Sequence, residues 1–98
     1  IIVDDIIDSG GTIVNAAKAL KDRGAKEVYV YITHGVLSGD AVKKIKSSVI
    51  KNLVITDTID NTNKIKNVKN IEVLPISGLM GEAIKRISNS TSVSDLFK

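Results

Sequence analysis

Short runs of β-branched and aliphatic residues alternate along the chain with segments that carry apolar residues at helical spacing. The runs predict strands at 1–3, 28–32, 53–56 and 71–74. The helical spacing predicts one helix over about 12–23, a short helix after Gly39 and a final helix after Ser77. Elements in this order indicate an α/β domain with a mainly parallel sheet, joined by right-handed crossovers and flanked by helices.

Individual residues refine this outline. The run 28–32 lacks alternation, so its strand is expected to be covered on both faces. Gly24 suits the left-handed position after the first helix, and Ser77 suits the cap before the last one. Segments 57–70 and 88–94 have no periodicity and predict exposed connections. The apolar stripe of the final helix, which we expect to lie in the core, consists of Met80, Ala83, Ile84 and Ile87.

Length and composition limit the classes of protein to consider. Ninety-eight residues, 43% of them hydrophobic, fit one folded domain with a modest core. No apolar run approaches the roughly 20 residues needed to span a membrane. The absence of cysteine excludes disulfides, thiol nucleophiles and thiolate metal sites. No signal-peptide pattern opens the chain, and a cytoplasmic protein is expected.

The charge pattern argues against a nucleic-acid surface. The net charge is +3, basic and acidic residues are interspersed, and the aromatic residues are Tyr29, Tyr31 and Phe97. Nucleic-acid surfaces more often combine clustered basic residues with stacking aromatics. The overall excess of lysine is interpreted as a solvated face that also attracts phosphorylated substrates. The lysines at 64, 66 and 69 are interpreted as solvated surface.

Two adjacent carboxylates, Asp4 and Asp5, follow the first predicted strand. Carboxylates accept hydrogen bonds, so this pair suits vicinal hydroxyls or a hydrated metal ion. A plain capped turn between strand and helix would leave two adjacent acids unexplained. The pair is therefore a candidate binding feature.

A small polar loop follows, made of Asp8, Ser9, Gly10, Gly11 and Thr12. The two glycines let backbone N–H groups approach a ligand, and the first turn of the next helix leaves more of them unpaired. Such donors and the helix dipole suit a phosphate. The Ser9 and Thr12 hydroxyls add donors, unless one of them caps the helix. Carboxylates beside a phosphate cradle predict a sugar phosphate as ligand.

The segment 4–12 resembles the phosphoribosyl-pyrophosphate loop of the type I phosphoribosyltransferase family. Within that superfamily the chain is most similar to the ribose-phosphate pyrophosphokinase family, on segments 25–28, 33–39, 56–59, 77–84 and 92–97. The resemblance implies a phosphoribosyltransferase-like, Rossmann-like domain that is partial. Because Ile1 falls inside a predicted strand with no methionine before it, we expect residues 1–98 to be a fragment. The resemblance implies that this fragment is the C-terminal part of a longer chain, beginning at the ribose-phosphate-binding loop.

The resemblance also implies an activity and its site residues. The reaction is transfer of diphosphate from ATP to ribose 5-phosphate, giving phosphoribosyl pyrophosphate and AMP. Asp4 and Asp5 would hold the ribose hydroxyls, and the loop 8–12 would hold the 5-phosphate. No catalytic residue and no metal ligand is assigned here, since the ATP site and most Mg2+ ligands would lie outside this fragment, which is expected to be inactive alone.

Regulation and assembly are implied in the same way. An effector site for phosphate and ADP would include Ser92, Ser94 and Phe97, although the tail by itself also fits a docked terminus with a Phe anchor. A homo-oligomer, a hexamer of dimers in the family, is expected. No nucleic-acid or membrane partner is expected.

Several alternatives stay open. A phosphoribosyltransferase acting on a nucleobase would share the loop, and a non-catalytic regulatory or associated subunit would share the fold. A phosphoreceiver with Asp57 as acceptor would need a lysine after a later strand, and 74–77 offers none. His34, the single histidine, is either a catalytic acid or base or a residue that orders its loop or a subunit contact, and we favour the second interpretation.

Overall fold

The computed structural model describes residues 1–97, and its elements follow the predicted order. They are β1 (Ile2–Ile7), α1 (Gly11–Asp22), β2 (Val28–Gly35), α2 (Ala41–Lys46), β3 (Ile50–Thr56), β4 (Ile71–Leu74), α3 (Ser77–Ser88) and the 3-10 helix η1 (Ser94–Phe97). The connection 57–70 contains no helix or strand, as predicted.

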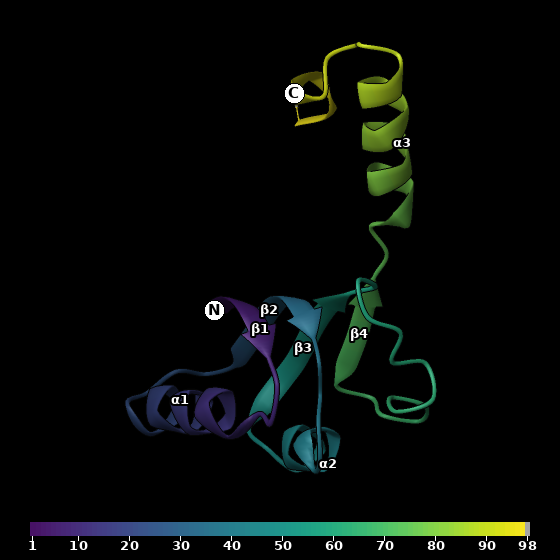
Figure 1. The fold of residues 1–98 in the computed structure, drawn as a ribbon. Coiled ribbons are helices and arrows are strands. Elements are labelled where there is room, and N and C mark those ends of the chain that lie inside the picture. The colour runs from purple at the N-terminus through teal and green to yellow at the C-terminus, as the bar shows by residue number, and fades with distance from the viewer. Residues whose placement is uncertain (98) are drawn as a thin grey trace.

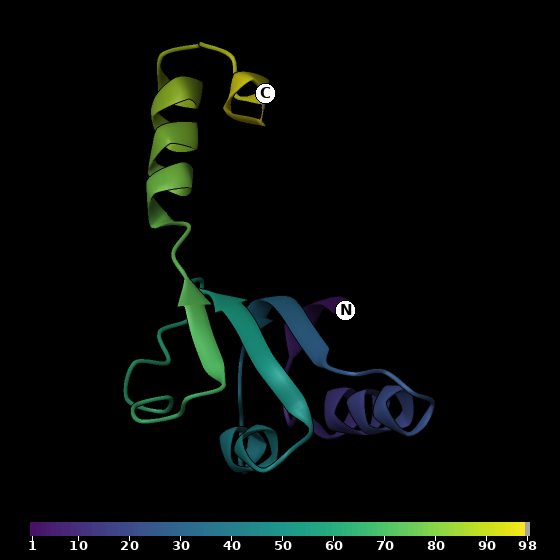
Figure 2. The same ribbon diagram turned by 180° about the vertical axis from the view of Figure 1, so that it is seen from behind.

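The four strands form one sheet in the order β1-β2-β3-β4, and every neighbouring pair is parallel. The predicted α/β class with a parallel sheet is therefore confirmed. Helices α1 and α2, which connect the first three strands, lie on one face of the sheet (Figures 1 and 2).

The core lies between that face and the two helices. Alternate residues of the central strands point into it and are almost fully buried, as in Val30, Ile32, Leu53 and Ile55. Helix α1 contributes Ile13 and Ala17, and α2 contributes Ala41 and Ile45. The helical periodicity read from the sequence is thus the pattern that packs here.

The opposite face of the sheet carries no helix of the described chain. Val3, Tyr31 and Leu74 lie there with 76%, 44% and 58% of their surface exposed. The prediction that strand 28–32 is covered on both faces was wrong. Both helices that follow β1 and β2 pack on the same side, so this chain covers only one face.

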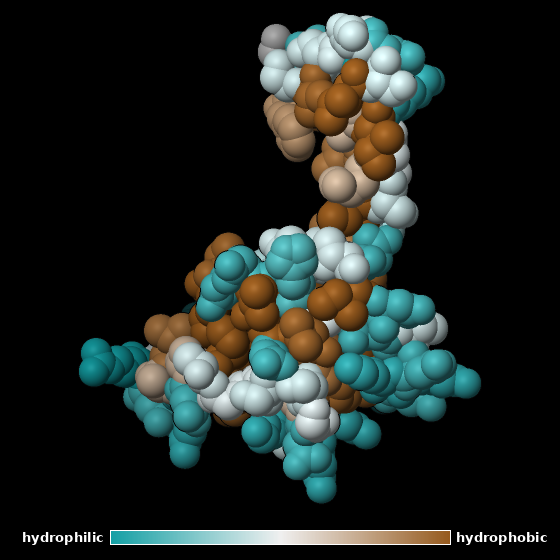
Figure 3. Space-filling model, viewed as in Figure 1, coloured by the Kyte–Doolittle hydropathy of each residue, from teal (hydrophilic) through white to brown (hydrophobic). Residues whose placement is uncertain are grey.

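Helix α3 projects away from the sheet and packs on none of the elements of the sheet body (Figures 1 and 2). None of its residues is buried, although its apolar and polar residues segregate as predicted. The expectation that Met80, Ala83, Ile84 and Ile87 lie in the core was wrong, since Met80 is 52% and Ile84 63% exposed. Figure 3 shows apolar side chains gathered on this projecting segment as well as on the sheet.

The helix ends follow backbone conformation rather than the predicted side-chain caps. Gly10 precedes α1 at a φ of 84°, and Gly24 follows it at 106°, as expected for the left-handed position. Ile76 precedes α3 without a side-chain cap, so Ser77 is its first residue and not its cap. Among residues 1–97, no helix has both the length and the apolar character to cross a membrane.

Candidate functional site

A hollow of about 260 Å3 lies where β1 ends and α1 begins. Five residues predicted for the sugar-phosphate loop line it, namely Asp4, Asp8, Ser9, Gly10 and Thr12. Asp5 and Gly11 are not among the lining residues, which are completed by Ile6, Ile7 and Ile13. The structure therefore gathers most, but not all, of the predicted loop around one space.

The glycine before α1 gives this hollow its backbone donors. The first helical hydrogen bond runs from the Val14 N–H to the Gly10 carbonyl, 3.0 Å long. The N–H groups of residues 11–13 therefore have no partner inside the helix. A Cβ on Gly10 would stand 3.7 Å from Ala41, an ordinary contact, so its positive φ is what favours glycine here.

A second loop braces the first one from the side of β2. The Ser38 hydroxyl donates to Asp8 Oδ1, and the Ser38 N–H donates to the Asp8 carbonyl at 3.0 Å. The N–H groups of Val36 and Leu37 donate to the Ile7 carbonyl at 2.9 and 3.2 Å. Reasoning from the sequence missed the role of Ser38, because its partner lies 30 residues away and no local pattern marks the pair.

The two adjacent carboxylates lie within β1 and not beyond its end, which corrects the predicted strand boundary. Successive side chains of a strand point to opposite faces, so Asp4 reaches the loop hollow while Asp5 does not. The Asp5 N–H donates to Asp4 Oδ1 at 2.7 Å.

The environment of Asp5 favours its charged form. Hydrogen bonding with the Asp4 side chain lowers the pKa of Asp5, helped by backbone N–H groups of Asp5 and Ile6 and by the field of His34. Asp5 is therefore a carboxylate at neutral pH, which accepts hydrogen bonds and donates none.

His34 and Asp57 each make one contact that organises a loop. His34 Nδ1 lies 2.8 Å from Thr58 Oγ1, which links the end of β2 to the segment after β3. This contact supports the interpretation of His34 as a loop-ordering residue. Asp57 Oδ1 accepts the Ile76 N–H at 2.8 Å, just before α3 begins.

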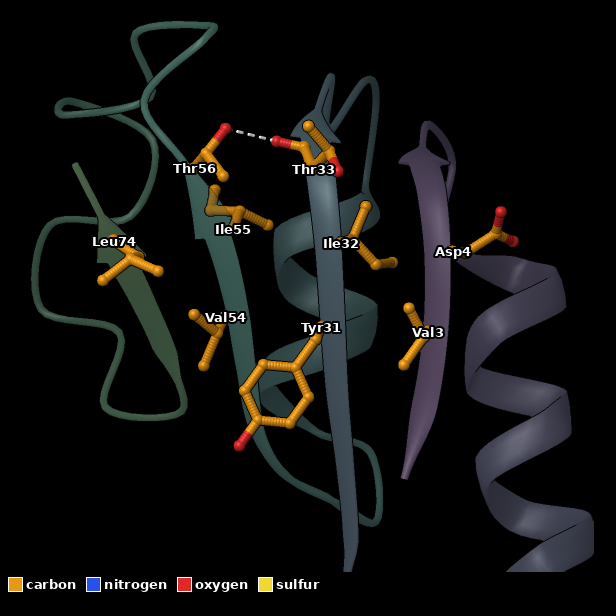
Figure 4. A pocket seen from close by; sticks show the side chains of 9 residues that line it. All are labelled: Val3, Asp4, Tyr31, Ile32, Thr33, Val54, Ile55, Thr56 and Leu74. Atoms are coloured by element: carbon orange, nitrogen blue, oxygen red, sulfur yellow. Dashed lines mark hydrogen bonds between the residues drawn. The ribbon is translucent and has the colours of Figure 1, made fainter. Parts of the chain in front are cut away.

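A second hollow, about 180 Å3 in volume, lies on the bare face of the sheet (Figure 4). Its lining is mainly apolar, with Tyr31 beside Val54, and Asp4 belongs to it as well as to the loop hollow. The Thr56 hydroxyl donates to the Thr33 carbonyl across its carboxyl-end rim (Figure 4). The Asp4 carboxylate points away from the other residues that line this second hollow (Figure 4).

The predicted effector residues lie in the tail that follows α3. Ser92 Oγ and Ser94 Oγ are 3.0 Å apart, and Arg86 Nη1 donates to the Ser92 carbonyl at 3.1 Å. Phe97 is 73% exposed, so it does not anchor the tail on the described chain. Within residues 1–97, no three His, Asp or Glu side chains come together as a metal site.

A family model for the phosphoribosyl synthetase-associated domain matches residues 1–98. This chain belongs to that family. A ribose-phosphate pyrophosphokinase of Hyphomonas neptunium is 59% identical over 99% of this chain and 31% of its own length. One of Buchnera aphidicola is 52% identical over the whole chain and again 31% of its own length.

A solved structure also resembles this member of the phosphoribosyl synthetase-associated domain family. Phosphoribosylpyrophosphate synthetase from Mycobacterium smegmatis superposes with a TM-score of 0.84 at 34% identity, over 90% of this chain and 29% of that one. The relatives are enzymes, and this chain spans about 31% of the length of the curated ones. The expected likeness to ribose-phosphate pyrophosphokinases is confirmed at the level of the family.

Proposed function

We propose that this chain supplies the ribose 5-phosphate-binding part of a ribose-phosphate pyrophosphokinase. The observation that carries the proposal is the loop hollow, where the Asp4 carboxylate faces the same space as residues 8–10 and 12. Hydroxyls and a phosphate at opposite ends of one sugar fit that pair of features.

Each end of the sugar would meet a different kind of group. The unpaired N–H groups at the start of α1 donate to the phosphate, with the Ser9 and Thr12 hydroxyls beside them. The Asp4 carboxylate accepts from ribose hydroxyls. Asp5, on the other side of β1, reaches a hydroxyl or a metal-bound water only from that opposite face.

Such a site contributes to the reaction by holding the sugar in a fixed position and orientation. Transfer of a phosphoryl-type group demands mainly alignment and charge stabilisation from a protein. Ser38 holds Asp8 and thereby the loop backbone, so the bound sugar presents its anomeric hydroxyl in one orientation. The ATP site would lie in a part of the full-length enzyme outside the roughly 31% that this chain covers.

Magnesium would accompany the ATP. The described chain offers it the carboxylates of Asp4 and Asp5 and no larger cluster among residues 1–97, so these two suit its water shell better than its direct coordination. Bound Mg2+ would neutralise charge on the transferred phosphates.

The proposal extends to the tail and to assembly. Ser92 and Ser94 stand with their hydroxyls 3.0 Å apart and Phe97 is exposed, so the three are available to a phosphate or ADP effector held with a neighbouring subunit. The assembly we propose is a homo-oligomer.

Calorimetric titration with ribose 5-phosphate tests the proposal directly. Asp4→Asn should weaken binding about tenfold, the effect of losing one charge-assisted hydrogen bond. Asp22→Asn, at the far end of α1, removes the same charge away from the hollow and should leave the affinity unchanged. Ribose without phosphate should bind far more weakly.

The outcomes separate the candidates. Equal binding by wild type and Asp4→Asn would contradict the sugar-phosphate site. The chain alone should form no phosphoribosyl pyrophosphate from ATP and ribose 5-phosphate. Formation of a nucleotide from phosphoribosyl pyrophosphate and a nucleobase would instead favour a phosphoribosyltransferase.

A further inference from the structure

The positive charge of this chain is concentrated in one part of its sequence. Residues 41–70 contain seven lysines and two aspartates, a net charge of +5, whereas the whole chain carries +3. The remaining residues are therefore net acidic, at −2. Such an asymmetry points to a local electrostatic role rather than to general solubility.

Part of this charge surrounds a hollow. A concave space of about 520 Å3, twice the volume of the loop hollow, is lined by Lys46, Lys51 and Lys69. It lies between the end of α2, the start of β3 and the turn before β4. Because the strands are parallel, this space lies at the amino ends of the strands, whereas the sugar-phosphate loop lies at their carboxyl ends.

Hydrogen bonds fix the walls of this space, which we call the lysine hollow. The Asn70 side-chain amide donates to the carbonyls of Ile45 and Ile50, at 2.9 and 3.2 Å. The Asn70 carbonyl in turn accepts the Leu53 N–H at 2.8 Å. Asn67, another lining residue, holds the left-handed conformation at a φ of 66°, which few residues other than glycine adopt.

The residues that line the lysine hollow carry positive charges and no negative ones. No Asp or Glu lines the lysine hollow, and the single ion pair among residues 1–97 is Glu82–Arg86, far along the chain. Lys64 of the same segment differs, because its ammonium donates to the carbonyls of Val36 and Leu37 at 3.2 and 3.3 Å. The three lysines of the hollow have no such acceptor within the described residues.

Carbonyl groups at the end of α2, beside the hollow, already have hydrogen-bond donors. The Ile45 carbonyl accepts from the Asn70 amide and the Ser48 hydroxyl, and the Lys43 carbonyl accepts from the N–H and hydroxyl of Ser47. Those carbonyl dipoles are therefore already engaged and do not face an incoming anion unpaired.

We propose that the lysine hollow binds a small polyphosphate, such as the phosphate chain of a nucleotide or an inorganic polyphosphate. Three lysine side chains that line one hollow can match the several negative charges of a polyphosphate. Nucleic acid fits less well, because no aromatic side chain lines the hollow to stack on a base. The site is separate from the loop hollow and does not depend on the proposed sugar-phosphate function.

The test is calorimetric titration of the chain with inorganic tripolyphosphate at low salt. The variant Lys46→Ala, Lys51→Ala, Lys69→Ala removes the lining charges. The matched variant Lys18→Ala, Lys26→Ala, Lys85→Ala removes three exposed lysines elsewhere and has the same net charge. The first variant should bind at least tenfold more weakly, and the second within about twofold of the wild type.

Equal losses in the two variants would overturn the proposal, since attraction would then depend on net charge alone. So would an absence of binding to the wild-type chain. Amide NMR shifts locate the ligand independently: they should appear at Asn67, Lys69 and Asn70. Shifts confined to 10–12 would assign the anion to the loop hollow instead, and would also overturn the proposal. If the triple variant does not fold, Lys69→Ala alone, in the irregular turn before β4, should still lower the affinity.

Discussion

Helices α1 and α3 are each 12 residues long, and in both of them apolar and polar residues lie on opposite sides. They differ in how much of the apolar side is buried. Helix α1 buries Ile13 and Ala17 against the sheet, whereas α3 buries nothing on the described chain. Figures 1 and 3 show the contrast between the packed body of the molecule and the projecting arm, which we define as residues 77–97.

The difference arises from the connections and not from the helices themselves. Gly10 turns the chain so that α1 returns along the sheet. After β4, Pro75 and Ile76 lead outward, and the Asp57 carboxylate holds the Ile76 N–H in that direction. An amphipathic pattern therefore predicts a helix and its apolar face, while the connection decides whether this chain covers that face.

The largest effect on stability should come from truncating the packed helix. Ile13→Ala removes a side chain that is 6% exposed and leaves a cavity beside the sheet. We expect a loss of about 2–5 kcal/mol in the free energy of unfolding. Urea unfolding monitored by circular dichroism measures it. A loss below about 1 kcal/mol would mean that α1 is not part of the cooperative core.

Replacing a glycine by alanine should lower the stability of the protein in the body but not in the arm. A Cβ at Gly35 would stand 2.7 Å from Ile55 Cδ1, so Gly35→Ala forces the buried Ile55 side chain to move and should cost about 1–3 kcal/mol. At Gly81 nothing lies within 4 Å, so Gly81→Ala should raise the helicity of α3 at no cost to the body. Thermal unfolding of both variants makes the comparison, and equal destabilisation would contradict it.

The joint between body and arm should show a smaller effect. Asp57→Ala removes the acceptor of the Ile76 N–H, worth about 1 kcal/mol locally. Hydrogen exchange at the Ile76 amide should become faster, while exchange in β3 stays slow. Asp57→Asn keeps an acceptor oxygen and should preserve most of the protection. Unchanged exchange in the Ala variant would show that this bond does not hold the arm.

The smallest effect on stability should come from replacing an isoleucine of the arm by alanine. Ile84 is 63% exposed, so Ile84→Ala removes little buried surface and gains helix propensity. The free energy of unfolding should change by less than about 0.5 kcal/mol, in urea unfolding run beside Ile13→Ala. A loss as large as that of Ile13→Ala would mean that α3 packs on the body in solution.

Most of the secondary structure was predictable because hydrophobic period and glycine positions are local signals. Strand 71–74 and the left-handed Gly24 were predicted as they are observed. The end of the first strand was not predicted, since the side chains of Asp4 and Asp5 are polar while β1, an edge strand, continues through both of them and pairs with β2 at Asp4, Ile6 and Ile7.

The candidate site was predictable to a similar degree. The glycines and hydroxyl groups of the loop 8–12 predict a binding loop from the sequence alone. Most of its residues do line one hollow. The bond between Ser38 and Asp8, the contact of His34 with Thr58 and the lysine hollow all join residues distant in sequence. Such pairs follow from the topology of the sheet, which periodicity alone does not specify.

The strand order of the sheet has a consequence for how the chain folds. Each strand pairs with the one made just before it, so each addition to the sheet closes only the loop formed by the most recent connection. Each of these loops still contains a crossover helix or the connection 57–70, and pairing of parallel strands across such connections is slow. Among the described strands, each can therefore join the sheet once the strand before it is in place, and the loop 8–12 with its partner Ser38 can form before the lysine hollow is complete.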